Sequence, residues 1–333
     1  MYRKVDIELL SIGDASLDAF LFPTESEALC QMNDKETLIC FSYGDKIPVR
    51  ELEFSIGGNA ANNSVGTRRL GVKSAAVLTL GEDDIGNQIE EKLRKEGVET
   101  SFISKVKDRR SNYSLAINYS GERTMFTYKD EIDYLFPQDL PKVNWVYLTS
   151  LGDDFGDVYA QTVDWVKANS GIKLAFNPGS RQIRAGVERI KDVLEVSEIL
   201  YVNRQEAEAI SSFGDSRGRE KELLSALSSI GPKNPIVTDG ANGAYVLYEG
   251  RCYKAGVLPV DAYERTGAGD AFGSGLLSAL IKGKEIEEAL LWGTVNSASV
   301  IGFVGAQKGL LRENEMANWL ERAISSGVSV EGI

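Results

Sequence analysis

Short runs of apolar, β-branched and aromatic residues recur along the chain, and longer segments with apolar residues every three or four positions separate most of them. The short runs are typical of buried strands, and the longer segments are typical of helices that bury one face. Their alternation predicts a three-layer α/β fold, in which helices cover both faces of a mostly parallel central sheet. The expected strands cover residues 8–13, 74–81, 145–151, 173–177, 198–203, 234–240 and 243–250, and the clearest helices cover 87–97, 157–171 and 219–231.

Two regions interrupt this alternation and predict a second, smaller sheet. Residues 19–54 contain short β-prone pieces without a clear helix, and residues 112–128 read as two strands around the turn YSGE at 119–122. Such a sheet would expose a face and an edge unless it covers a ligand cleft or pairs with another subunit. From Gly267 onward the chain is mainly helical and no linker precedes it, so we expect one domain over residues 1–333.

The charge balance excludes two classes of partner. The chain has 37 Lys and Arg against 49 Asp and Glu, a net charge of −12, which repels nucleic acid and anionic lipid surfaces. The start, MYRKVDIELL, is charged where a signal peptide needs apolar residues, and no run approaches the roughly 20 apolar residues of a membrane span. We therefore expect a cytosolic protein with neither nucleic acid nor membrane as partner.

The complete absence of histidine restricts the chemistry further. It excludes Ser-His-Asp and Cys-His catalysis, His-ligated zinc and histidine bases. Three scattered cysteines, at positions 30, 40 and 252, are too few for a disulfide framework. Acid-base chemistry must therefore come from carboxylates, Lys, Tyr or Cys, with substrate phosphates or magnesium supplying further charge.

One glycine-rich run carries a candidate reaction centre. TGAGDAFGSG, residues 266–275, leads into the helical stretch LLSALIKG, so small residues stand where free backbone N–H groups make an anion site. Asp270 at this turn is able to accept a proton from an attacking hydroxyl, while the amides of Gly267, Ala268 and Gly269 stabilise a transferred phosphoryl group. Taken alone, the same residues also fit a simple helix cap and a turn.

A second run removes much of that ambiguity. SIGGNAAN at residues 55–62, followed by a stretch that ends in GEDDIG, and TGAGDAFGSG at the other end of the chain resemble the two signatures of the ribokinase-like (pfkB) carbohydrate kinase family. They occur in the family's order, and confirming context of this kind decides a motif. The resemblance extends from about residue 7 to about residue 319. It implies the family's α/β core, with residues 19–54 and 112–128 as its β-sheet lid.

The resemblance also implies a set of substrate-binding residues. Asp18 ends the segment GDASLD, which is similar to the family's first G-x-x-x-x-D motif, and a strand-end turn is the other interpretation of that segment. Asp18 and Asn62 are implied to hold substrate hydroxyls, with the backbone of Gly57 and Gly58 close by.

ATP and magnesium are the implied cofactors. Asn203 and Glu206 match the family's N-x-x-E motif, which organises magnesium and the phosphates, although an N-cap with a surface glutamate is the simpler interpretation of that spacing. The nucleotide is implied to contact Thr238, Gly240, Gly243, Asn296 and Gly305.

One departure from the family pattern concerns a monovalent cation. Where the family usually has DTT, this chain has Glu264-Arg265-Thr266, and the family's aspartate often belongs to a monovalent-cation site. A longer acid beside an arginine is able to balance its own charge, so the resemblance leaves potassium activation open.

The resemblance implies an ATP-dependent kinase that phosphorylates a hydroxyl of a small sugar or sugar acid, with Asp270 as base. A nucleoside kinase on the same fold is the alternative, with Phe41, Tyr43, Phe126 and Tyr128 as candidates for clamping a base. A sugar- or nucleotide-sensing protein without activity is a third interpretation. Dimerisation through the lid is common in the family, so a homodimer is the expected assembly.

Overall fold

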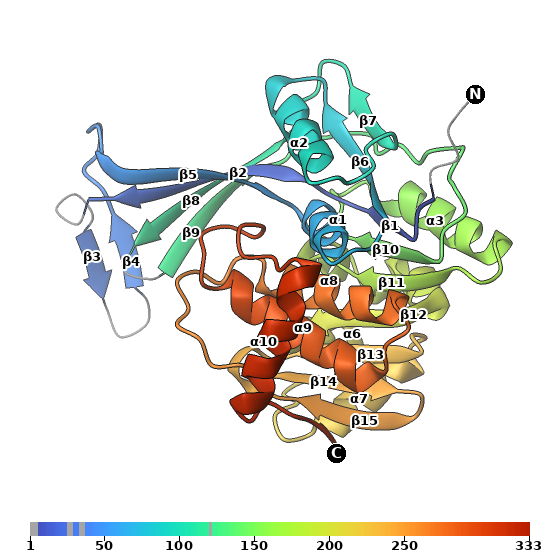
Figure 1. Ribbon diagram of the computed structural model, residues 1–333. Helices are drawn as coiled ribbons and strands as arrows, with labels where there is room; N and C mark the ends of the chain where they lie inside the picture. Colours follow the sequence, from blue (N-terminus) through green and yellow to red (C-terminus); the bar gives the residue numbers. More distant parts are fainter. Residues whose placement is uncertain (1–5, 25–28, 33–36, 120–121) are drawn as a thin grey trace.

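The computed structural model describes residues 6–24, 29–32, 37–119 and 122–333. Its main sheet, in the described part of the chain, has ten strands in the order β16-β15-β14-β13-β12-β11-β10-β1-β6-β7 (Figure 1). The strands from β7 to β13 pair in parallel, and β14, β15 and β16 add an antiparallel edge. The strands are β1 (Leu9–Ile12), β6 (Ser74–Gly81), β7 (Ile103–Val106), β10 (Trp145–Thr149), β11 (Lys173–Asn177), β12 (Ser197–Asn203), β13 (Asn234–Thr238), β14 (Ala244–Tyr248), β15 (Arg251–Ala255) and β16 (Val330–Gly332).

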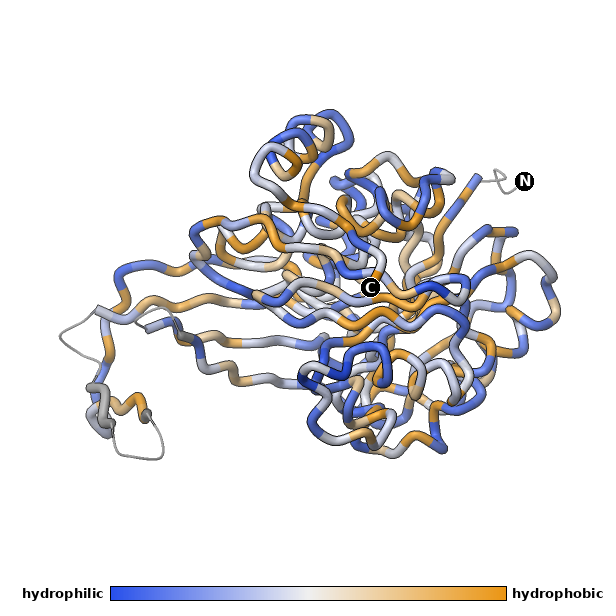
Figure 2. Tube along the Cα trace, turned by 90° about the horizontal axis from the view of Figure 1, so that it is seen from below, coloured by the Kyte–Doolittle hydropathy of each residue, from blue (hydrophilic) through white to orange (hydrophobic). Residues whose placement is uncertain are grey.

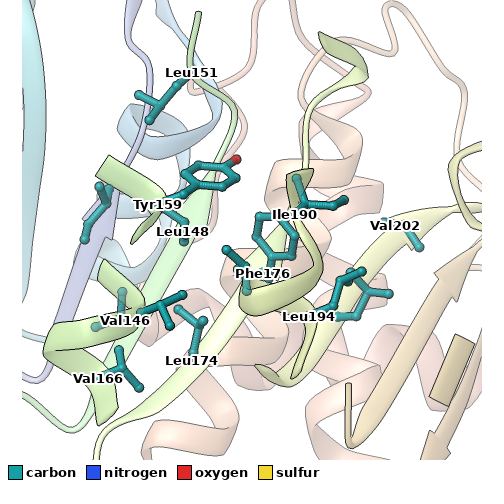
Figure 3. Close-up of a cluster of buried hydrophobic side chains, with 14 of the residues drawn as sticks. Val146, Leu148, Leu151, Tyr159, Val166, Leu174, Phe176, Ile190, Leu194 and Val202 are labelled. Atoms are coloured by element: carbon teal, nitrogen blue, oxygen red, sulfur yellow. The ribbon is translucent and has the colours of Figure 1, made fainter. Parts of the chain in front are cut away.

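Helices cover both faces of this sheet because its central strands are apolar on both sides. In β10, Val146 and Leu148 face one core while Trp145 and Tyr147 face the other. The first core contains α3, α5, α6 and α7, and part of it is shown in Figure 3. The second contains α8, α9 and α10, and a third cluster adds α1 and α2. The α-helices are α1 (Asn59–Arg69), α2 (Asp84–Lys95), α3 (Gly156–Ala168), α4 (Ser180–Arg184), α5 (Lys191–Val196), α6 (Arg204–Ser211), α7 (Glu220–Ser229), α8 (Ala268–Ile281), α9 (Ile286–Val300) and α10 (Glu313–Ser325).

A separate four-stranded sheet projects from this body (Figure 1), in the order β5-β2-β8-β9. Its strands are β2 (Ser16–Pro23), β5 (Val49–Gly57), β8 (Asn112–Tyr119) and β9 (Glu122–Tyr128), and a hairpin of β3 (Leu29–Met32) and β4 (Thr37–Cys40) lies beyond it. In Figure 2 the projecting strands carry both hydrophobic and hydrophilic segments. The centre of the predicted turn at 119–122, Ser120 and Gly121, lies outside the described residues.

The two faces of the small sheet differ in their surroundings. Phe20 and Met125 on the inner face pack with Val304 of the body. Phe54 and Phe126 on the outer face are 60% and 58% exposed. The inner face of the small sheet therefore contacts the body, while its outer face is apolar and is exposed at Phe54 and Phe126.

The predicted fold class is confirmed, with a large mostly parallel sheet between helices and a separate small sheet. The alternating pattern did not predict α1, because that helix is made largely of Asn, Ala, Ser and Gly and is buried on nearly all sides. It also did not predict β15, β7 and β16, of which β7 and β16 are short and lie at the edges of the sheet. Within the described residues, we find no helix with the length and apolarity needed to span a bilayer.

Candidate active site

The two glycine-rich runs meet inside the molecule. Helix α1 starts after Gly58, helix α8 starts after Gly267, and the two helices pack against each other. The amide of Asn62 on α1 donates a 2.8 Å hydrogen bond to the Asp270 carboxylate in the first turn of α8. Gln307 holds the other end of the Asn62 amide, because its Nε2 donates to Asn62 Oδ1 at 3.0 Å.

This environment tunes the Asp270 carboxyl group. Burial raises the pKa of Asp270 to about 6, and the hydrogen bond from Asn62 opposes that rise by favouring the ionised form. A carboxylate with such a pKa is mostly ionised at neutral pH, yet it is a stronger base than an exposed aspartate. Both properties suit a general base.

Backbone amides lie at the start of α8, next to Asp270. Gly267 is the N-cap of α8 with φ 77°, a left-handed conformation that favours glycine, and a Cβ there would lie 2.4 Å from Ala306 Cβ. The next residues, Ala268 and Gly269, begin the helix, where N–H groups lack partners within the helix and the dipole is positive. The Tyr201 hydroxyl donates to Gly269 O at 2.7 Å and so braces the turn. The three predicted anion-binding amides therefore lie at a helix start beside Asp270.

The small sheet brings Asp18 close to the end of β5. A Cβ on Gly57 would lie 2.0 Å from Asp18 Oδ2, so the carboxylate occupies space that only glycine leaves free. Burial raises the pKa of Asp18, and the hydroxyls of Ser16 and Ser114 and the charge of Arg123 oppose the rise. Asp18 thus lies on the inner face of the small sheet, in the field of Arg123.

A small cavity of about 110 Å³ adjoins the start of α1. Gly58 and Asn59 line it together with Asp14, Tyr128 and Lys129. Asp14 is buried and pairs with Lys129, which follows β9 directly. Sequence reasoning missed both residues, although Asp14 stands inside the quoted GDASLD segment. A larger depression of about 540 Å³ lies between β5 and α2, and none of the predicted site residues lines it.

The magnesium candidates form a reciprocal cap on α6. Asn203 Oδ1 accepts from Glu206 N, and Glu206 Oε2 accepts from Asn203 N, both at 2.9 Å. Burial raises the pKa of Glu206, the Asn203 backbone N–H opposes this, and the charge of Asp270 raises it further. A cation would relieve the repulsion between the Glu206 and Asp270 carboxylates. The amide oxygen of Asn203 is a type of ligand that magnesium accepts. In the described part of the chain, no group of three or more acidic or cysteine side chains could hold a metal by itself.

The predicted nucleotide-binding residues fall into two groups. Thr238 ends β13, and Gly240 follows it at a surface where an added Cβ would meet no atom within 4 Å. At Gly243 an added Cβ would lie 2.0 Å from Ala255 O, so the close approach of the neighbouring strand requires this glycine.

The second group is enclosed by protein. Asn296 is fully buried, and its amide donates to Ala271 O at 2.7 Å and accepts from Leu311 N at 2.9 Å. Gly305 packs against Ser55 of the small sheet. In this structure Asn296 holds the start of α8 to the segment before α10, and it does not reach an open surface.

Sequence reasoning also missed Arg123, which lies on β9. Its guanidinium pairs with Glu264 and bonds the Thr266 hydroxyl, immediately before the turn that begins α8. The basic residue next to Glu264 in the sequence, Arg265, is not its partner in any described contact. No local sequence signal identifies Arg123, because the pair joins β9 to a distant segment, the one that precedes α8.

Known proteins share this architecture. Residues 24–313 match the model of the pfkB family carbohydrate kinases. The ribokinase of Haemophilus influenzae is 24% identical over 290 residues, which cover 84% of this chain and 92% of that protein.

Two solved structures share the fold. The structure of Arabidopsis thaliana ribokinase complexed with ribose and ATP matches with a TM-score of 0.78 at 18% identity, over 95% of this chain and 99% of that one. The Methanocaldococcus jannaschii nucleoside kinase matches with a TM-score of 0.74 at 19% identity, over 95% and 98%. The family match over most of the chain confirms the resemblance seen in the two signatures, and this chain belongs to the pfkB family carbohydrate kinases, phosphotransferases with an alcohol group as acceptor.

Proposed function

We propose that this chain is an ATP-dependent kinase that phosphorylates a hydroxyl group of a small sugar or sugar acid. The observation that carries this proposal is the placement of Asp270. It is a half-buried carboxylate with its pKa raised to about 6, it accepts a hydrogen bond from Asn62 at 2.8 Å, and it lies in the first turn of α8 beside the backbone amides of the helix start. A base beside an anion site is the arrangement that phosphoryl transfer to a hydroxyl requires.

In the proposed reaction, the substrate lies between the inner face of the small sheet and α1. Asp18 holds its hydroxyls, with the backbone of Gly57 and Gly58 close by. Asn62 keeps the Asp270 carboxylate in place and ionised. Asn62 would thus act on the base itself, whereas the sequence led us to expect that it contacts the substrate. Asp270 takes the proton from the attacking hydroxyl while the turn at 267–269 stabilises the charge on the transferred group.

Asn203 and Glu206 are the residues that would hold magnesium, through water or directly. When bound, magnesium neutralises charge on the phosphate oxygens. Thr238, Gly240 and Gly243 lie on the strand-turn that would contact ATP. The small sheet acts as a lid, and it excludes water, which would compete as a phosphoryl acceptor.

The aromatic residues that a nucleoside kinase would need do not converge in this structure. Phe126 lies on the outer face, Tyr43 is fully exposed, and Tyr128 alone of the four candidates lines the cavity beside Asn59. This supports a sugar over a nucleoside. In a panel of ribose, fructose, 2-keto-3-deoxygluconate, adenosine and cytidine, we expect ATP consumption to be fastest with a sugar or sugar acid. Fastest turnover with a nucleoside would contradict the proposal, and ligand binding without turnover on the whole panel would favour a sensor.

Replacing the proposed base tests the mechanism directly. Asp270→Asn keeps the size and shape of the side chain but removes the proton acceptor, so we expect kcat to fall by about 10²- to 10⁴-fold. The matched control is Asp84→Asn, which alters an exposed aspartate in the first turn of α2 and should leave kcat unchanged. Near-wild-type turnover by the Asp270 variant would disprove the assignment.

The pH dependence of kcat/KM should report the Asp270 carboxyl group. Because the base must be ionised, activity should fall as the pH drops through about 6. Asn62→Leu removes the bond that favours the ionised form, so the midpoint of this acid limb should move to higher pH. Asn314→Leu, at an exposed site on α10, is the control. An unmoved midpoint in the Asn62 variant would show that another group titrates.

We also propose that the small sheet's outer face joins two copies of the chain. The strand register places Phe54, Ala19, Leu115 and Phe126 in one row across the four strands, and both phenylalanines are largely exposed. An apolar sheet face is self-complementary about a two-fold axis, and pairing would remove it from water.

A charge in that row should separate the copies. We expect wild-type protein to sediment at twice the mass of one chain and the double variant Phe54→Glu, Phe126→Glu to sediment as one chain. Ile324→Glu, at an exposed apolar position on α10, should not change the mass. A monomeric wild type, or a dimeric double variant, would refute this interface.

A further inference from the structure

Strand β9 of the small sheet brings a positive charge to the turn before α8. The Arg123 guanidinium pairs with the Glu264 carboxylate and bonds the Thr266 hydroxyl. The Glu264 side chain is only 7% exposed, and that of Arg123 is 34% exposed. Arg123 therefore contacts Thr266, the residue that directly precedes Gly267, the N-cap of α8.

Glu264 joins three segments that are distant in the sequence. Its Oε1 accepts the Thr266 backbone N–H at 2.7 Å and faces Arg123. Its Oε2 accepts the Gly305 backbone N–H at 3.3 Å, and its own N–H donates to Ile301 O at 3.1 Å. Glu264 thus connects the segment before α8 to the segment after α9, and Arg123 connects both to the small sheet.

In the family, the acid that Glu264 replaces often belongs to a monovalent-cation site, and the resemblance leaves open whether this chain has one. Here that carboxylate already faces a guanidinium, a hydroxyl and two backbone N–H groups. A metal cation at Glu264 would meet the repulsion of Arg123 at close range, or would have to displace it. The residues present do not fit a monovalent cation.

We propose that the Arg123 guanidinium takes the place of a monovalent metal ion beside this turn, so that the kinase needs no such ion. The positive charge is then present at the turn only when the small sheet lies over the body. This inference rests on the proposed function. Arg123 acts through Glu264 and Thr266, which makes it a positioning residue for the amides of the turn.

The charge of Arg123 also acts on the substrate side. Burial raises the pKa of Asp18, and Arg123 opposes this rise while Glu264 adds to it. The charge of Arg123 therefore acts both on the Asp18 carboxylate and on the segment before the turn. A movement of the small sheet that displaced Arg123 would therefore affect both Asp18, the proposed substrate-binding residue, and the turn that begins α8.

The test compares wild type, Arg123→Ala, Arg123→Lys and the control Arg50→Ala, an exposed arginine on β5 of the same sheet. Each is assayed with the best acceptor of the panel in potassium chloride and in tetramethylammonium chloride at equal ionic strength. We expect wild-type kcat to agree within about twofold between the two salts. Arg123→Ala should lose about tenfold or more in kcat, as loss of a supporting partner typically does, and Arg123→Lys less.

Guanidinium at millimolar concentration should restore part of the Arg123→Ala activity and leave Arg50→Ala unchanged, which a general loss of folding would not do. Activation of the wild type severalfold by potassium, or an unchanged kcat in Arg123→Ala, would overturn the proposal.

A second readout does not depend on turnover. The melting temperature of the wild type should be equal in the two salts, and a rise specific to potassium would show a bound cation and refute the inference. If no acceptor supports turnover, the proposed function fails, while this comparison still decides whether the chain binds potassium.

Discussion

The hydrogen bond from Asn62 to Asp270 is the contact on which the rest of the site depends. A carboxylate that is largely withdrawn from water is costly unless a donor compensates it, and here the donor comes from another helix. Helices α1 and α8 must therefore pack closely, and their small residues permit this. Gln307 then orients the amide from the segment that follows α9. One bond thus links the two helices, and it also lowers the pKa of the proposed base.

The small sheet serves the site through the alternation of its side chains. Asp18 and Arg123 lie on its inner face, where they approach the turn before α8, and Phe54 and Phe126 lie on its outer face. Because successive residues of a strand point to opposite faces, one face of the sheet carries the charged groups near the site and the other offers exposed phenylalanines. The same strands that line the proposed substrate site also offer the surface proposed for pairing.

The chain contains no histidine, so other groups must supply its titratable base and its positive charges. Burial gives Asp270 a pKa in the range where histidine usually works, and helix-start amides supply positive potential without a titrating group. Glu264 is balanced by Arg123, and Asp14 by Lys129, so both cations of the β9 region are engaged with acids of the body. These pairs join the small sheet to the body at two points. Along the strand direction, the row that contains Asp18 lies between them.

The sequence by itself determined the layered fold, the family and the candidate base, because strand and helix periodicities are local and the two signatures are contiguous runs. Local patterns could not predict α1, since it is buried on nearly all sides and has no apolar stripe. Only the tertiary structure decided that Asn62 bonds Asp270, that Asn296 is enclosed and that Arg123, rather than the adjacent Arg265, pairs with Glu264. The residues of these pairs are 208 and 141 positions apart, so their contacts follow from how helices and sheets pack and not from spacing along the chain.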